Sequence, residues 1–317
     1  MVMATPFLQS LKGSLDGELW AIGKSTGMHI YNGLDLFDRY IPNDDKSLEG
    51  FLDRAGRLRA VGFERGIVLP HSFRSALLFF AGGVKERVGY SRNKRGFLLT
   101  KTVPESPDLE PTVEHYLRLV DVVGGTRSAD APFLSVTEDE ERKFDDRHMD
   151  IQRGFVAFIV GAQYGSSKRW PDSYFSELAD LITTRCGKRV YILPGKGEEA
   201  MAEKVRQGAT NKGDIEVRVL DIRDLKVCLS RASLVVTNDT GPRHISAALS
   251  RPTVVLLGPM DERYTAYPAP SSAVMVKDVP CRPCNKKKCN GDHACMKGIT
   301  PDEVFNKVLE MLARDAA

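Results

Sequence analysis

The stretch SLVVTNDTGPRHISAAL at residues 233–249 decides the fold of this chain. Its first five residues are mostly apolar and include two valines, which predicts a buried strand. The polar letters NDTG then make a sharp turn, and PRHISAAL predicts a helix whose small residues pack closely on a sheet. A turn of this kind leaves backbone N–H groups unpaired at the positive end of the helix dipole. The stretch therefore predicts a strand–turn–helix unit that can hold phosphate.

Side chains with useful chemistry gather at the carboxyl end of this predicted strand. Asp239, Thr240 and Gly241 form the turn, and His244 lies on the first turn of the helix. Ligands of open parallel sheets bind outside the carboxyl ends of the strands, so these residues face the expected ligand space. A plain turn with Asp239 as a local cap is the simpler interpretation. An acid, a hydroxyl, a glycine and an imidazole at one strand end favour a binding site.

Two further loops follow predicted strands in the same half of the chain. GAQYGSSKRWP at residues 161–171 is rich in donors, and its Lys168 and Arg169 add charge for a diphosphate. LPGKGEE at residues 193–199 supplies carboxylates of the kind that accept hydrogen bonds from ribose hydroxyls. Glycine-serine loops and acidic helix starts are also common without a ligand.

Short apolar runs alternate with amphipathic stretches along the chain, which predicts parallel sheets covered by helices. Between residues 124 and 152 the composition turns polar, and we interpret its charged run TEDEERKFDDRHMD as a solvated helix and a linker. We therefore predict an α/β protein of two domains, at residues 1–150 and 151–317, that face a cleft. The predicted strands are 18–23, 39–41, 66–70, 154–160, 189–193, 233–237 and 253–257. The predicted helices are 27–36, 46–61, 73–81, 113–123, 173–186, 198–207, 223–230, 242–249 and one that begins at 301.

Bulk composition narrows the classes of function. The chain has 317 residues and a formal net charge of +3, which is too small to indicate a nucleic-acid partner. No apolar run reaches the roughly 20 residues of a membrane-spanning helix. The first residues lack the basic region and cleavage site of a signal peptide. We therefore expect a cytoplasmic protein.

Together, GAQYGSSKRWP, TNDTGPRHISAAL and LLGP resemble the motifs of glycosyltransferase family 9, the ADP-heptose:lipopolysaccharide heptosyltransferases. HSFRSALLFFAGGVKERVGY at residues 71–90 is similar to the first domain of the heptosyltransferase II branch, and the likeness covers nearly the whole chain. It implies the GT-B fold, with two Rossmann-like domains, and inverting transfer that requires no metal or other cofactor. It also implies donor contacts: Lys168 at the phosphates, Glu198 at the ribose, Asp239 at the sugar hydroxyls, and Thr240, Gly241 and His244 at the diphosphate.

The resemblance further implies an acceptor, the lipid A-core part of lipopolysaccharide, met by peripheral contact with the inner membrane. Its acidic, phosphorylated groups would face basic side chains of the first domain. The candidates are Arg74, Arg92, Lys94 and Arg95, and ordinary surface charge is the simpler interpretation of each.

The sequence departs from the family pattern in two places. Pro242 lacks an N–H where the family's loop supplies one, so one phosphate hydrogen bond is lost or replaced by Arg243. The family also opens with a strand and a Gly-Asp loop, whereas this sequence opens at Met1 on the helix that follows them. We therefore expect a first domain without its first strand, and a general-base aspartate that lies before Met1, which leaves the catalytic residue unknown. A start codon assigned too late explains this, and a truncated homologue that binds donor without activity is the alternative.

Four cysteines lie close together near the end of the chain, in CRPCNKKKCNGDHAC at residues 281–295. Four thiols at this spacing can surround one ion, and in a reducing compartment that is favoured over disulfides. The spacing between the second and third is shorter than zinc ribbons use, so a loop of reduced cysteines is the alternative. The candidate ligands of a structural zinc are Cys281, Cys284, Cys289 and Cys295.

These features predict transfer of heptose from ADP-heptose to the lipopolysaccharide inner core. A family member that uses another nucleotide sugar stays open, because sugar choice depends on a few contacts. A nucleotide-sugar epimerase of the same fold is a further alternative. It requires carboxylates from both domains, and the first domain offers no convincing one.

Overall fold

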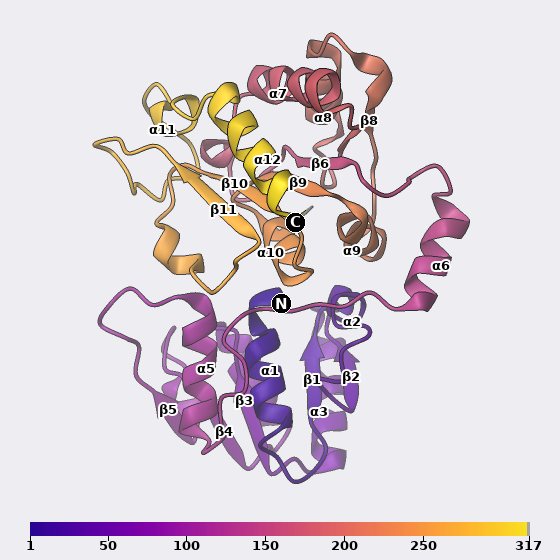
Figure 1. Ribbon diagram of the computed structural model, residues 1–317. Coiled ribbons are helices and arrows are strands. Elements are labelled where there is room, and N and C mark those ends of the chain that lie inside the picture. Colours follow the sequence, from indigo (N-terminus) through magenta and orange to yellow (C-terminus); the bar gives the residue numbers. More distant parts are fainter. Residues whose placement is uncertain (316–317) are drawn as a thin grey trace.

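Two α/β domains lie one above the other in the computed structural model, which describes residues 1–315 (Figure 1). The first five strands belong to the lower domain in this view, and the last six belong to the upper domain. The chain passes between them through a long linker that contains one helix. No helix within residues 1–315 has the length and apolar character that crossing a membrane requires.

The upper domain holds one parallel sheet of six strands, in the order β11-β10-β9-β6-β7-β8. Its central strands are buried along their whole length, which explains their nearly unbroken apolar sequences. The strands are β6 (Val156–Ile159), β7 (Val190–Ile192), β8 (Ile215–Val217), β9 (Leu234–Asn238), β10 (Thr253–Leu257) and β11 (Ser272–Val276). The helices are α7 (Asp172–Cys186), α8 (Glu199–Gly208), α9 (Ile222–Arg231), α10 (Gly241–Ala248), α11 (Ala294–Lys297) and α12 (Pro301–Asp315).

The lower domain has two separate parallel sheets, one of β1 and β2 and the other of β3, β4 and β5. Within residues 1–315 no strand joins them, which agrees with the predicted lack of a first strand. The strands are β1 (Trp20–Gly23), β2 (Arg39–Pro42), β3 (Arg65–Val68), β4 (Glu86–Tyr90) and β5 (Lys101–Val103). The helices are α1 (Thr5–Lys12), α2 (Ser25–Ile30), α3 (Leu48–Val61), α4 (Phe73–Ala81) and α5 (Thr112–Val122).

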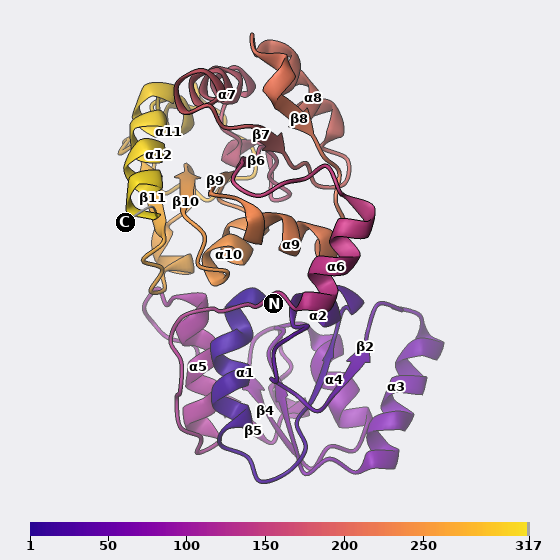
Figure 2. The ribbon, with the colours of Figure 1, turned by 45° about the vertical axis from the view of Figure 1, so that its right-hand side comes forward.

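One apolar core crosses the boundary between the domains. Phe7 of α1 and Ile30 of α2 belong to the same cluster of buried side chains as Val227 of α9 and Ile245 of α10. The turned view shows the upper ends of α1 and α2 directly below α9 and α10 (Figure 2). Because burial of apolar side chains is the main favourable term in folding, this shared core fixes the domains against each other.

The linker helix α6 (Glu138–Arg147) is exposed over most of its residues, as its charges predicted, but it is not solvated all round. Phe144 is fully buried, and Glu140 faces Lys226 of α9, which is also fully buried. The Nζ atom of Lys226 lies 2.6 Å from Glu140 Oε1 and donates to the backbone oxygen of Asn32 at 3.1 Å. The acidic run compensates a buried cation far away in the sequence, which a pattern within one segment cannot reveal.

Each predicted element overlaps an observed one, but four strands were not predicted. These are β4, β5, β8 and β11, of which β5 and β8 are three residues long and β4 begins with two charged residues. The helix predicted at residues 27–36 ends at Ile30, and Gly33 beyond it has a positive φ of 82°. The predicted capping box of α12 is confirmed, since Thr300 and Glu303 exchange hydrogen bonds of 3.0 and 3.3 Å.

Candidate functional site

Asp239 is the centre of the site at the carboxyl end of β9. Its Oδ2 atom lies 2.6 Å from Lys168 Nζ, and its Oδ1 atom lies 2.5 Å from Arg243 Nη1. Lys168 also donates to the backbone oxygen of Asp239 at 3.1 Å. The structure therefore joins the loop after β6, the turn after β9 and the first turn of α10. The sequence predicted Lys168 and Asp239 for this site and suggested Arg243 only as a replacement donor.

The ionisation of Asp239 is set by the two cations beside it. Burial raises the pKa of Asp239, but the nearby charges of Arg243 and Lys168 outweigh it, so the pKa lies below its ordinary value. Asp239 is therefore ionised at neutral pH and neutralises one of two cations. The remaining positive charge suits an anionic ligand.

A buried amide holds two of these loops together. Asn238 Oδ1 accepts a hydrogen bond of 3.0 Å from the backbone N–H of Trp170, and its Nδ2 donates to the backbone oxygen of Val160 at 2.7 Å. Trp170 in turn donates through Nε1 to the backbone oxygen of Ile299 at 2.8 Å. Asn238 was not predicted, because its partners lie on distant segments and the letters NDTG indicate only a turn.

His244 lies in the first turn of α10 and is neutral. Its Nδ1 atom is 2.8 Å from the hydroxyl of Tyr267. Burial, followed by the charge of Arg243, lowers the pKa of His244 to about 3. Its imidazole therefore offers hydrogen bonding without charge at neutral pH. Tyr267 was not predicted, because it comes from an irregular loop with no sequence pattern.

The start of α10 carries the predicted phosphate-binding turn. Thr240 is the N-cap residue, Gly241 begins the helix, and Pro242 follows within the first two positions. The Arg243 side chain turns back to Asp239. It is thus committed elsewhere, and the expectation that it replaces the missing N–H of Pro242 is not supported.

Glu198 is the N-cap residue of α8, beyond the loop that follows β7, and its carboxylate packs against a glycine. Its Oε2 atom accepts a hydrogen bond of 3.0 Å from the backbone N–H of Gly195. A Cβ atom added at Gly161, after β6, would come within 1.7 Å of that carboxylate. The close approach needs glycine at position 161. It places Glu198 beside the loop that carries Lys168.

The cysteine-rich loop at residues 281–295 packs on the same loop. Ser167 N–H donates to the backbone oxygen of Lys287 at 3.2 Å, and the Tyr164 hydroxyl donates to that of Asn285 at 2.7 Å. His293 Nε2 lies 2.7 Å from the backbone oxygen of Ser167. Residues more than 110 positions apart thus share one structural unit next to Lys168.

The four cysteines of this loop are free thiols. Burial raises the pKa of Cys295, and the neighbouring charges of Cys281, Cys289 and Cys284 raise it further. In the described part of the chain, however, no three of these sulfur atoms lie within 4.8 Å of one another. The zinc ligand set stays a prediction.

The basic candidates of the lower domain have different surroundings. Arg95 is fully buried and donates to the backbone oxygens of Tyr90, Ser72 and Pro70. It stabilises the loops after β3 and β4, so its prediction as an acceptor contact is wrong. The other candidates stay predictions: Arg74 is exposed and donates to the backbone oxygen of Ser47, and Arg92 and Lys94 are exposed.

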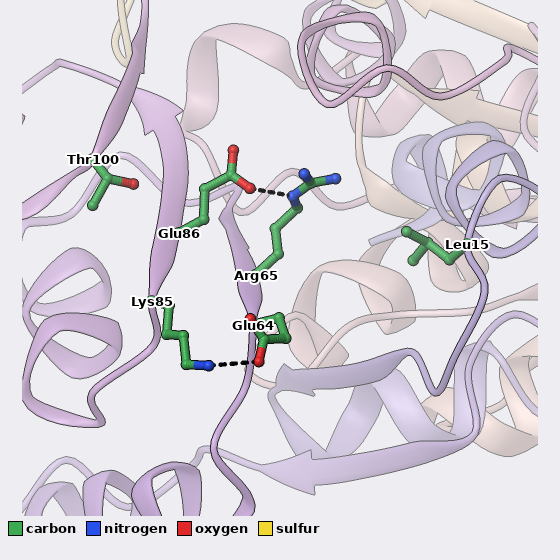
Figure 3. A pocket seen from close by; sticks show the side chains of 6 residues that line it. All are labelled: Leu15, Glu64, Arg65, Lys85, Glu86 and Thr100. Atoms are coloured by element: carbon green, nitrogen blue, oxygen red, sulfur yellow. Dashed lines mark hydrogen bonds and ion pairs between the residues drawn. The ribbon is translucent and has the colours of Figure 1, made fainter.

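Two pockets differ in their relation to this site. One of about 570 Å³ lies at the amino ends of β3 and β4, where the ion pairs Arg65–Glu86 and Lys85–Glu64, both at 2.6 Å, line it (Figure 3). It is at the opposite end of the strands from the chemistry. The other, of about 770 Å³, is lined by α5, residues 127–130 and residues 266–268. It is lined from both domains and reaches Tyr267, and the ligand-binding cleft at the strand ends stays a prediction.

Two parallel-sheet domains, with a cationic site at the strand ends of the second, have the architecture of the GT-B fold. The family model of glycosyltransferase family 9 (heptosyltransferase) matches residues 53–294. The chain belongs to glycosyltransferase family 9, and it is an enzyme of the transferase class.

Individual relatives agree with this membership. Lipooligosaccharide heptosyltransferase 2 of Haemophilus influenzae is 27% identical over 278 residues, which cover 82% of this chain and 80% of that one. Lipopolysaccharide heptosyltransferase 2 of Escherichia coli K12 is 27% identical over 275 residues, covering 82% and 78%. The structure of E. coli ADP-heptose LPS heptosyltransferase II superposes with a TM-score of 0.86 at 21% identity, covering 100% and 96% of the two chains. The last comparison confirms the fold.

Proposed function

We propose that this chain transfers heptose from ADP-heptose to the inner core of lipopolysaccharide, with inversion at the anomeric carbon. The observation that carries the proposal is the buried Asp239, held between Lys168 and Arg243 at the start of α10. Family membership and relatives named heptosyltransferase 2 support the choice of sugar. The family also favours transfer over the epimerase alternative.

The donor is proposed to bind across the strand ends of the upper domain. Its diphosphate meets Lys168 and the turn of Thr240 and Gly241, where the helix dipole and the excess positive charge favour an anion. Asp239 accepts hydrogen bonds from sugar hydroxyls, and Glu198 from the ribose. Neutral His244 then serves as a hydrogen-bonding group rather than as a second counter-charge.

The acceptor is proposed to be lipid A-core, reached by peripheral contact with the cytoplasmic face of the inner membrane. It enters from the lower domain, where Arg74, Arg92 and Lys94 are exposed at or near strand and helix ends. The reaction itself is proposed to need no cofactor. A zinc ion held by the four cysteines would have a structural role.

Calorimetric titration with ADP tests the donor site. Lys168→Ala should weaken ADP binding by about 10- to 100-fold, because a hydrogen bond to a charged group contributes about 1.5–3 kcal/mol. Lys188→Ala is the matched control, since Lys188 bonds the backbone oxygen of Gly154 at the opposite end of the sheet. Full binding by Lys168→Ala would contradict the site. A preference for UDP over ADP would keep the assignment of the site but contradict ADP-heptose as the donor.

A further inference from the structure

A second cluster of side chains lies at strand ends of the lower domain. His71 follows β3, Glu105 follows β5, and His115 lies in the first turn of α5. One ligand atom from each lies within 4.8 Å of the other two, and within residues 1–315 this is the only such group of histidine, cysteine and acidic side chains. The Nε2 atoms of the two histidines are 3.2 Å apart, and His71 Nδ1 is 3.7 Å from Glu105 Oε1.

Hydrogen bonding within the cluster is incomplete. The Nδ1 atom of His115 is 3.2 Å from Glu110 Oε2, and because a carboxylate only accepts, this nitrogen carries the proton. The Nε2 atom of a neutral His115 then presents a lone pair toward His71. On the other side, His71 Nδ1 and Glu105 Oε1 are both buried and without a hydrogen-bond partner. An ion can take only one nitrogen of His71, and an ion at the two Nε2 atoms leaves the proton of a neutral His71 on Nδ1, where it faces the unpartnered Glu105 Oε1.

The spacing of the two histidines matches that of zinc ligands. Two nitrogens bound tetrahedrally to zinc, at about 2.0–2.1 Å each, lie about 3.3 Å apart. Two histidines and one carboxylate are also a common protein ligand set, which leaves at least one coordination position for water or another oxygen.

Neighbouring residues hold His115 as metal-binding histidines are usually held. A ligand histidine normally donates its second N–H to a carboxylate, which fixes its orientation and raises its basicity. Glu110 accepts this bond and is itself held by Arg118 at 3.1 Å. The ring of Tyr90 stacks on His115, with centroids 3.8 Å apart and planes at 14°.

We propose that His71, Glu105 and His115 bind a divalent transition-metal ion of the zinc type at the strand ends of the lower domain. The site is independent of the donor site and of the cysteine loop. Its three side chains are 14–34% exposed, so an ion can reach them from solvent. One group competes with the ion, since Arg92 Nε lies 3.3 Å from Glu105 Oε1.

Titration of the full-length, reduced protein with Co²⁺ tests this site separately from the thiols. Bound to nitrogen and oxygen, cobalt gives visible ligand-field absorption without the near-ultraviolet charge-transfer band that thiolate ligands produce. We expect one equivalent of Co²⁺ to give that spectrum. Glu110→Gln should weaken the affinity by about 10- to 100-fold, and His71→Asn and His115→Gln by more. Arg92→Ala should strengthen it, because the competing cation is gone.

His29→Asn is the matched control, since His29 lies on α2 outside the cluster, and its Co²⁺ affinity should not change. Far-ultraviolet circular dichroism of each variant shows that it is folded, and Glu105→Gln gives a second, conservative test of the carboxylate. The proposal fails if no such spectrum develops, since a protonated His71 then bridges Glu105 and His115. It also fails if the spectrum survives both histidine substitutions, or carries the thiolate band and disappears when the thiols are alkylated.

Discussion

The two polar clusters at strand ends, one in each domain, are satisfied to different degrees. In the upper domain, both oxygens of Asp239 meet cations at 2.5 and 2.6 Å, and the carboxylate is almost fully buried. In the lower domain, Glu105 is 34% exposed and has a buried oxygen without a hydrogen bond. The ion pairs of the first cluster form without a ligand, and they stabilise the loops that carry them. The second contributes little to the fold until something binds it.

Neutralising the carboxylate of each cluster should give the largest difference between them. Asp239→Asn leaves two buried cations without their counter-charge, so the free energy of unfolding should fall by about 3–5 kcal/mol. Glu105→Gln changes a group that is about one-third exposed and should cost at most about 1 kcal/mol. Urea unfolding of both variants measures this, and equal losses would break the comparison.

The stability of the boundary between the two domains should depend on Lys226. Lys226→Ala removes a buried cation that bonds Glu140 and Asn32, and it should cost about 3 kcal/mol, because the mostly buried carboxylate of Glu140 loses its counter-charge. Lys143→Ala, which breaks the exposed pair with Asp139, should cost under about 1 kcal/mol in the same urea experiment. Comparable effects of the two would show that the buried pair does not hold the domains.

Arg95 holds the loop that carries His71, so it should stabilise the part of the fold that positions the His71 cluster. Arg95→Ala removes charged hydrogen bonds to the backbone on both sides of that loop, and unfolding should become easier by about 2–3 kcal/mol. Lys94→Ala, next to it and exposed, should have almost no effect. Thermal denaturation compares the two, and an unchanged melting temperature for Arg95→Ala would contradict the buried role.

His244, beside the Asp239 cluster, should make the free energy of unfolding depend on pH. The unfolded chain takes up a proton on this residue near pH 6.5, whereas the folded protein does so only near pH 3. Because the unfolded state binds more protons between these values, stability falls as the pH decreases, by about 2 kcal/mol from pH 7 to pH 5. His244→Gln should remove this part of the slope in urea titrations at several pH values. An unchanged slope would mean that His244 titrates normally in the folded protein.

Elements and site residues could be predicted best from the sequence where strands are continuous and buried. The turn after β9 was found because VV and NDTG stand at a strand end, and the strand ends of one parallel sheet meet at one edge. It failed where a side chain serves a distant partner. Asn238 and Arg95 bond backbone atoms of other segments, and Glu140 compensates Lys226 across the linker, so no local pattern reveals them.

The lower domain was harder to predict for a physical reason. Its strand β5 has only three residues, and β4 and β5 both begin with charged residues that are not fully buried. The His71 cluster also joins three segments that are distant in sequence. None of the described residues is assigned as the general base that removes the proton from the acceptor hydroxyl.

The packing of the cysteine-rich loop on the loop of Lys168 limits how this segment can vary among related chains. Two of the contacts from Tyr164 and Ser167 end on backbone oxygens of residues 285 and 287, not on their side chains. Substitution of those side chains therefore leaves the contacts in place, whereas insertion or deletion of a single residue moves every acceptor at once. Related chains should vary freely at residues 285–287 while the length of the segment stays the same.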